Sequence, residues 1–160
     1  MNPNNFYYRT AIKAIKTIAI TLVVMTILAV LYRYCVKYDS QRAVRFITTY
    51  SMKKSHECCA GWVMAAIIAG GEPCILLRGC DYDRLLPLLG FEEIVTAGTK
   101  DQDNYKGQVG DIVVFPATGK HIFGHIAMWN GERWVSDFKQ KHFFCATAYR
   151  KTPYKIFRNK

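Results

Sequence analysis

Residues 55–71 have the sequence SHECCAGWVMAAIIAGG, which predicts a helix that begins near a cysteine. Four apolar residues recur at the spacing of one buried helical face: Trp62, Val63, Ala66 and Ile67. Gly70-Gly71 is a typical helix end. A cysteine at a helix N-terminus feels the helix dipole and free backbone N–H groups, and both favour the thiolate. The stretch therefore suits a nucleophilic thiol, although a buried structural cysteine is the common alternative.

Two adjacent cysteines compete for this position. Neighbouring residues on a helix point about 100° apart, so only one of Cys58 and Cys59 can face the protein interior. Cys59 precedes the four apolar residues of the buried face by three, four, seven and eight positions, which is the spacing of one helical stripe. We therefore predict that Cys59 faces inward and that Cys58 does not.

The second half of the chain has the period of two that is typical of strands. We expect strands over residues 110–116, 122–129 and 133–138, and a last, edge strand over 154–157. Asn130-Gly131 is a strong hairpin signal between the second and third of these strands. Residues 81–90 suit a short helix, and the polar residues 96–108 suit a surface loop. A helical half followed by an antiparallel sheet indicates an α+β fold.

The hairpin predicts a catalytic constellation. His125 lies in the second strand, and Asp137 lies twelve residues later on the other arm, so the two can be neighbours on one face. A Cys–His pair needs a third group that fixes the tautomer and orientation of the imidazole, and a carboxylate does this well. Cys59, His125 and Asp137 are therefore our candidate catalytic residues. A histidine satisfied in the core is the alternative for His125.

The N-terminus is basic and apolar. The net charge of the chain is +10, and five bases flank one apolar run: Arg9, Lys13, Lys16, Arg33 and Lys37. The 16 uncharged residues of 17–32 span about 24 Å as a helix, short of a ~30 Å hydrocarbon core. Lys16 and Arg33 can snorkel, so we expect a single-pass membrane anchor within residues 1–37. A cleaved signal peptide and a soluble helix remain alternatives.

Several motifs together resemble a known clan. Cys59-Ala60 at a helix start, GDIVVF at 110–115 and GHIAMW at 124–129 resemble the papain-like NlpC and CHAP cysteine peptidases of the cell wall. AGG at 69–71, WVSDFKQ at 134–140 and YRK at 149–151 are more similar to the peptidoglycan amidase effectors of type VI secretion. The resemblance covers about two-thirds of the chain, roughly residues 55–157.

The resemblance implies specific roles. Cys59 would be the nucleophile, His125 the general base and Asp137 the orienting residue, with Ser136 as the weaker candidate for the last role. The implied reaction is hydrolysis of amide bonds in peptidoglycan peptide stems or crosslinks by an antibacterial effector or cell-wall hydrolase, with an immunity protein or secretion apparatus as possible partners. A membrane-tethered module on the same fold that is catalytically inactive or transfers acyl groups is the alternative.

These expectations define three segments and a location. Residues 1–37 would be the anchor helix, 38–54 a linker helix and 55–160 the amidase domain, placed on the periplasmic or extracytoplasmic side. Six cysteines in such a compartment suggest disulfides, with Cys74 and Cys80 near each other, although free thiols would suit a cytosolic face.

We expect no metal, cofactor or nucleic acid. On a strand, His121 and His125 would lie about 13 Å apart, too far to share a zinc ion. The chain shows no interleaved basic and aromatic motif typical of nucleic-acid binding.

Overall fold

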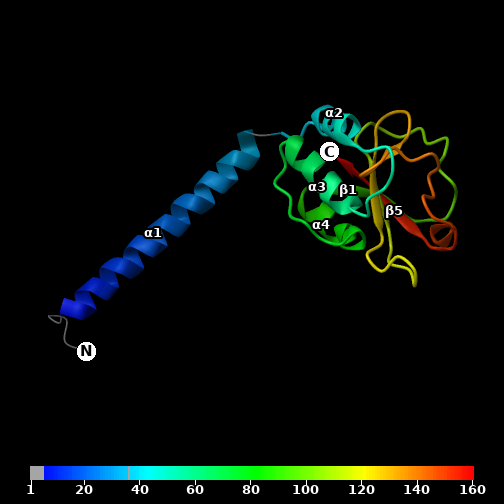
Figure 1. The fold of residues 1–160 in the computed structure, drawn as a ribbon. Helices are drawn as coiled ribbons and strands as arrows, with labels where there is room; N and C mark the ends of the chain where they lie inside the picture. Colours follow the sequence, from blue (N-terminus) through cyan, green and yellow to red (C-terminus); the bar gives the residue numbers. More distant parts are fainter. Residues whose placement is uncertain (1–5, 36) are drawn as a thin grey trace. The chain divides into compact units, whose positions relative to one another are not determined.

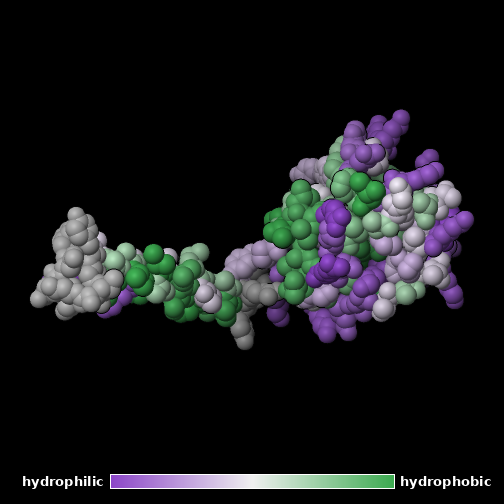
Figure 2. All heavy atoms as spheres, turned by 90° about the horizontal axis from the view of Figure 1, so that it is seen from below, coloured by the Kyte–Doolittle hydropathy of each residue, from purple (hydrophilic) through white to green (hydrophobic). Residues whose placement is uncertain are grey.

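The computed structural model describes residues 6–35 and 37–160, which belong to two units, Met1–Lys37 and Tyr38–Lys160 (Figure 1). The first unit is built on helix α1, Phe6–Cys35. Its stretch Arg9–Tyr32 has the length and the composition that crossing a membrane requires, although a signal sequence would have them too. The space-filling view shows apolar side chains covering the visible face of this helix (Figure 2).

Three threonines of α1 satisfy their hydroxyls within the helix. Thr17, Thr21 and Thr26 each donate from Oγ1 to the carbonyl oxygen four residues earlier, over 2.8–3.0 Å. This bonding is the usual way in which a helix tolerates a hydroxyl in apolar surroundings. These three hydroxyls therefore add no unpaired polar group to an otherwise apolar surface.

The second unit has an α+β fold. Helices α2 (Ser40–Tyr50), α3 (Cys59–Ala69) and α4 (Tyr82–Leu88) come before the strands, with the 3₁₀ helix η1 (Gly79–Asp81) leading into α4. The strands are β1 (Phe91–Gly98), β2 (Ile112–Phe115), β3 (His125–Trp129), β4 (Trp134–Val135) and β5 (Tyr154–Asn159), and η2 (Thr147–Lys151) precedes β5. They form one antiparallel sheet in the order β1-β5-β2-β3-β4.

The sheet has a core on each face. On one face, α2, α3 and α4 pack against alternate strand residues such as Ile112, Ile126 and Phe157. On the other face, an aromatic cluster that includes Phe115 and Trp134 lies under the loops that precede β2 and β5. These are the two sets of side chains that the pleat sends to opposite faces of the sheet.

Part of the predicted arrangement of strands is confirmed. The hairpin at Asn130-Gly131 is confirmed, with Trp129 paired to Trp134 and a hydrogen bond of 3.1 Å from the N–H of Asn130 to the carbonyl of Arg133. The prediction of an edge strand at the C-terminus is wrong, because β5 lies between β1 and β2. Strand β1, which the sequence reading missed, covers that edge and extends to Gly98.

The helical half also differs in detail. α3 begins at Cys59, so Glu57 lies before the helix, with a positive φ of 61°. Val63, Ala66 and Ile67 are buried as expected, whereas Trp62 is only half-buried. The segment 38–54, expected as a linker, belongs to the compact unit, because Ala43, Val44 and Ile47 of α2 lie in its core. α2 ends at Tyr50, whose side chain is exposed.

Candidate active site

Cys59 is the first residue of α3, and its thiol lies between this helix and the sheet. Cys58 occupies the N-cap position without a capping side-chain hydrogen bond, so the first N–H groups of the helix are not capped by a side chain. Cys59 is half-buried and packs against the core, whereas Cys58 is exposed. The inward position of Cys59 and the exposure of Cys58 agree with the helical phase that the sequence predicted.

The thiol of Cys59 is held in its neutral form. Burial raises the pKa of Cys59 above its usual value, while the backbone N–H groups of Ile126 and Ala60 counteract that effect and Asp137 adds to it. The helix terminus alone was expected to favour the thiolate, but desolvation has the larger effect here. Cys59 therefore needs a base to become a nucleophile.

His125 supplies an imidazole at the start of β3. The chain enters the strand through Gly124, which has a φ of +65°, and a Cβ there would lie 2.5 Å from the carbonyl oxygen of Phe115 and 2.6 Å from the Cβ of Cys80. The N–H of Cys80 donates to the carbonyl of Phe123 over 2.9 Å, which ties η1 to the same turn. Only glycine fits this conformation and this close approach, so the sequence Gly124-His125 sets the position of the ring.

The imidazole of His125 is a neutral base. His125 is 7% exposed, and burial lowers its pKa from 6.5 to about 4, although the negative charge of Asp137 opposes the shift. At neutral pH the ring therefore carries one proton and one free lone pair, which general-base catalysis requires.

Gln140 is the hydrogen-bond partner of His125. Its Nε2 lies 2.6 Å from the Nε2 of His125, and its Oε1 is buried without a partner. The two groups can pair in two ways: the amide NH₂ donates to a lone pair on Nε2, or, with the amide oxygen and nitrogen exchanged, the carbonyl oxygen accepts from an Nε2–H. The second arrangement puts the imidazole proton on Nε2 and leaves the lone pair on Nδ1, the ring nitrogen that does not face Gln140.

Asp137 has a different set of partners from the one that its place in the motif suggests. Its fully buried carboxylate accepts hydrogen bonds from the hydroxyl of Ser55 (3.0 Å), the N–H of His56 (2.6 Å) and the hydroxyl of Ser136 (3.1 Å). These bonds hold the loop that leads into Cys59. The negative charge of Asp137 acts on the pKa of His125, and the hydroxyl of Ser136 donates to Asp137 and not to the imidazole.

Cys59 and His125 line one pocket of about 400 Å³. Glu57, Lys120 and Tyr149 are among its other lining residues, whereas Asp137 lies behind the wall. The structure thus brings two of the three predicted residues to one surface and adds Gln140, which the sequence reading missed. Gln140 stands in the WVSDFKQ motif, but no spacing rule distinguishes it from its neighbours.

The five cysteines of the compact unit do not form crosslinks. Cys58, Cys59, Cys74, Cys80 and Cys145 are all free thiols, so Cys74 and Cys80, which the sequence offered as one candidate pair, are not bridged. Within residues 6–35 and 37–160, no three His, Cys, Asp or Glu side chains gather in a way that could hold a metal ion.

Solved structures share this fold and much of this sequence. No protein-family model and no curated protein matches the chain. A chain in the crystal structure of the native type VI effector–immunity complex Tae3–Tai3 from Ralstonia pickettii is 32% identical, with a TM-score of 0.62 over 77% of this chain and 100% of that one. In the selenomethionine form of the complex, the identity is 31% and the TM-score 0.63, over 72% of this chain and 98% of that one. At this identity and coverage, the chain belongs to the family of the type VI effector Tae3.

Proposed function

We propose that this protein is a papain-like cysteine hydrolase that cleaves amide bonds in the peptide stems or crosslinks of peptidoglycan. The observation that carries the proposal is that Cys59 and His125, from a helix start and a strand start, line one pocket, with Gln140 bonded to the far nitrogen of the imidazole. Kinship with Tae3, a type VI effector, supports a cell-wall hydrolase effector.

The geometry suits a two-step acyl transfer. Nδ1 of His125 takes the proton of the Cys59 thiol as the sulfur attacks the carbonyl carbon of the amide. The uncapped N–H groups at the start of α3 stabilise the oxyanion that forms. The imidazolium then protonates the leaving amine, and a thioester remains on Cys59. Water, deprotonated by His125, hydrolyses the thioester and restores the thiol.

Gln140 and Asp137 take separate supporting roles in this mechanism. Gln140 keeps the proton on Nε2 of His125, so that Nδ1 is the basic nitrogen in every cycle. Asp137 holds the loop before Cys59 through the N–H of His56 and the hydroxyl of Ser55, and its charge favours the imidazolium that forms during attack.

Two further features belong to the proposal. Helix α1 anchors the chain in a membrane, because Arg9–Tyr32 is long and apolar and three of its threonine hydroxyls are bonded within the helix. The compact unit lies on the side that faces the cell wall, because the proposed substrate is there. A dedicated immunity protein binds the chain, since the related structures are effector–immunity complexes.

Digestion of purified sacculi tests the proposed function. The full chain, solubilised in detergent micelles, is incubated with sacculi, and the released fragments are identified by mass spectrometry. We expect soluble peptide-containing fragments with one new amine and one new carboxylate for each cut. Sacculi that stay intact, or fragments cut only at glycosidic bonds, would contradict the proposed reaction.

A further inference from the structure

A second pocket continues the catalytic pocket toward a basic surface. It has a volume of about 320 Å³ and shares three lining residues with the catalytic pocket: Ser55, Phe138 and Cys145. The two pockets therefore adjoin along the loop that precedes α3 and the segment that follows β4. We call this second pocket the lysine pocket.

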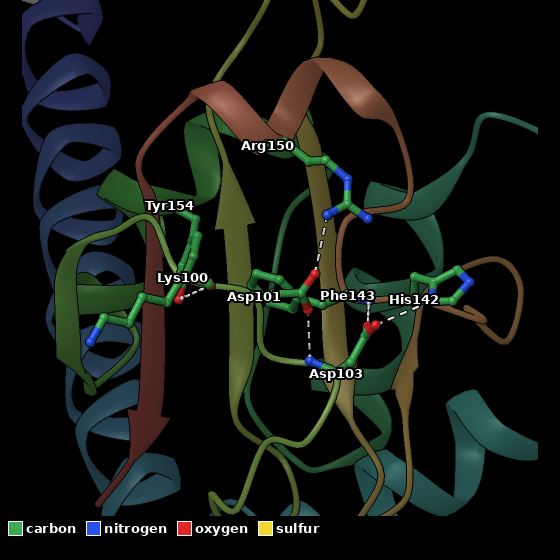
Figure 3. A network of polar contacts seen from close by, with 7 residues as sticks. All are labelled: Lys100, Asp101, Asp103, His142, Phe143, Arg150 and Tyr154. Carbon is green, nitrogen blue, oxygen red and sulfur yellow. Dashed lines mark hydrogen bonds and ion pairs between the residues drawn. The ribbon is translucent and has the colours of Figure 1, made fainter.

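Four lysines give the pocket its charge. The side chains of Lys53, Lys54, Lys139 and Lys141 line it, and no carboxylate is among its lining residues. In the part of the chain that the structure describes, no acidic side chain forms an ion pair with any of the four. By contrast, His142, which also lines the pocket, lies 3.1 Å from Asp103 (Figure 3).

The two lysine pairs come from distant parts of the sequence and are held together by the backbone. The N–H of Met52 donates to the carbonyl of Asp137 over 2.7 Å, and Met52 forms a parallel bridge with Phe138. In the segment that follows β4, the N–H of Phe143 donates a hydrogen bond to the carboxylate of Asp103, and Arg150 pairs with Asp101 at 3.3 Å (Figure 3). The walls are therefore fixed by contacts that leave all four lysines unpaired.

The four unpaired lysine charges around the lysine pocket create a positive electrostatic potential that favours binding of an anion. If the proposed function is correct, the substrate is a peptide that carries free carboxylates close to its scissile amide. We propose that the lysine pocket binds the free carboxylates of the peptide stem while the amide to be cleaved lies at Cys59. This inference rests on the proposed function and adds a charge preference to it.

The test compares matched variants on matched substrates. Lys139→Gln/Lys141→Gln removes two charges from the pocket, and Lys106→Gln/Lys151→Gln removes two from exposed positions that line none of the described pockets. The substrates are a soluble crosslinked muropeptide with free carboxylates and the same muropeptide with those carboxylates amidated. The full chain in detergent micelles is used throughout, and melting temperatures confirm folding.

We expect the wild type to prefer the carboxylate substrate through a lower KM. The Lys139/Lys141 variant should raise that KM roughly 2- to 30-fold, the range for two exposed ion pairs, and should lose most of the preference. Its KM for the amidated substrate and its kcat should stay near the wild type, and the Lys106/Lys151 variant should behave as the wild type. Equal effects on both substrates, or equal effects of both variants, would overturn the inference.

Binding to a Cys59→Ala background separates this inference from the proposed function. If the wild type cleaves neither muropeptide but the Cys59→Ala chain binds the carboxylate form more tightly, the lysine pocket stands and the proposed reaction fails. If the wild type cleaves both muropeptides equally well, the reaction stands and the lysine pocket fails.

Discussion

Replacing Gln140 by leucine removes the hydrogen bond to Nε2 of His125 at nearly constant side-chain volume. His125 and Gln140 are 7% and 2% exposed, so water cannot replace the lost acceptor. A buried N–H without a partner costs about 1–3 kcal/mol, and the tautomer with the proton on Nε2 loses this stabilisation. We expect kcat to fall roughly 10- to 100-fold, which corresponds to about 1.4–2.7 kcal/mol in the barrier.

Two companion variants identify the cause of that loss. Gln140→Glu places a carboxylate next to the imidazole, which should raise the pKa of His125 and move the acid limb of the kcat/KM profile to higher pH. Gln102→Leu is the matched control, because Gln102 likewise makes one partly buried side-chain hydrogen bond, from its Nε2 to the hydroxyl of Tyr154 over 2.8 Å, but its partner does not line the catalytic pocket. It should lower the melting temperature and leave kcat unchanged.

The assay is hydrolysis of a soluble muropeptide followed across pH, with the melting temperature measured on the same preparations. If Gln140→Leu lowers the melting temperature but keeps the wild-type kcat, Gln140 is only a packing residue and the tautomer argument is refuted. An unshifted acid limb in Gln140→Glu would refute it independently.

The remaining predictions concern acid stability, Asp137 and the N-terminal helix. The pKa of His125 is about 4 when folded and 6.5 when unfolded, so the unfolded chain binds the extra proton first as pH falls. The free energy of unfolding should therefore drop by about 3 kcal/mol between pH 6.5 and 4. If His125→Asn shows the same pH dependence of that free energy as the wild type, relative to pH 7, this prediction is contradicted. Asp137→Asn should cost about 1–3 kcal/mol of stability and should reduce kcat/KM by displacing Cys59. Ser136→Ala removes only one of the three hydrogen bonds to that carboxylate and should cost less. Thermal melts and kinetics that rank the two variants the other way would reject the role of Asp137 in holding the loop before Cys59. The full chain should stay with membranes after an alkaline carbonate wash, and its recovery in the soluble fraction at its uncleaved mass would remove the anchor.

Strong local signals predicted much of the fold. The α3 stretch, its glycine end and the Asn130-Gly131 hairpin follow from side-chain period and turn chemistry, and the structure contains all three. Strand β1 was missed because its sequence FEEIVTAG has a mixed pattern. Two of its glutamates point to lysines instead of to the core: Glu93 lies 3.1 Å from Lys155, and Glu92 lies 3.4 Å from Lys160. Without β1, nothing in the sequence could show that β5 is an interior strand.

Local sequence patterns did not identify the residue that binds the imidazole of His125. The sequence placed Asp137 on the hairpin arm next to His125, but β4 ends at Val135, and the N–H of Ser136 closes a tight turn onto the carbonyl of Phe138. The turn sends Asp137 to the loop before Cys59. It returns Gln140 to the hairpin, where its N–H bonds to the carbonyl of Trp134 over 3.0 Å. A single turn after a two-residue strand therefore decided which side chain reaches the imidazole.

The most direct test of the central claim compares the two adjacent cysteines on purified sacculi. Cys59→Ala and Cys58→Ala remove the same atoms from neighbouring positions, one half-buried in the catalytic pocket and one exposed at the N-cap. Release of peptide-containing fragments should be abolished by Cys59→Ala and largely retained by Cys58→Ala, at melting temperatures close to that of the wild type. Fragment release that survives in a folded Cys59→Ala chain would contradict the assignment of Cys59 as the nucleophile.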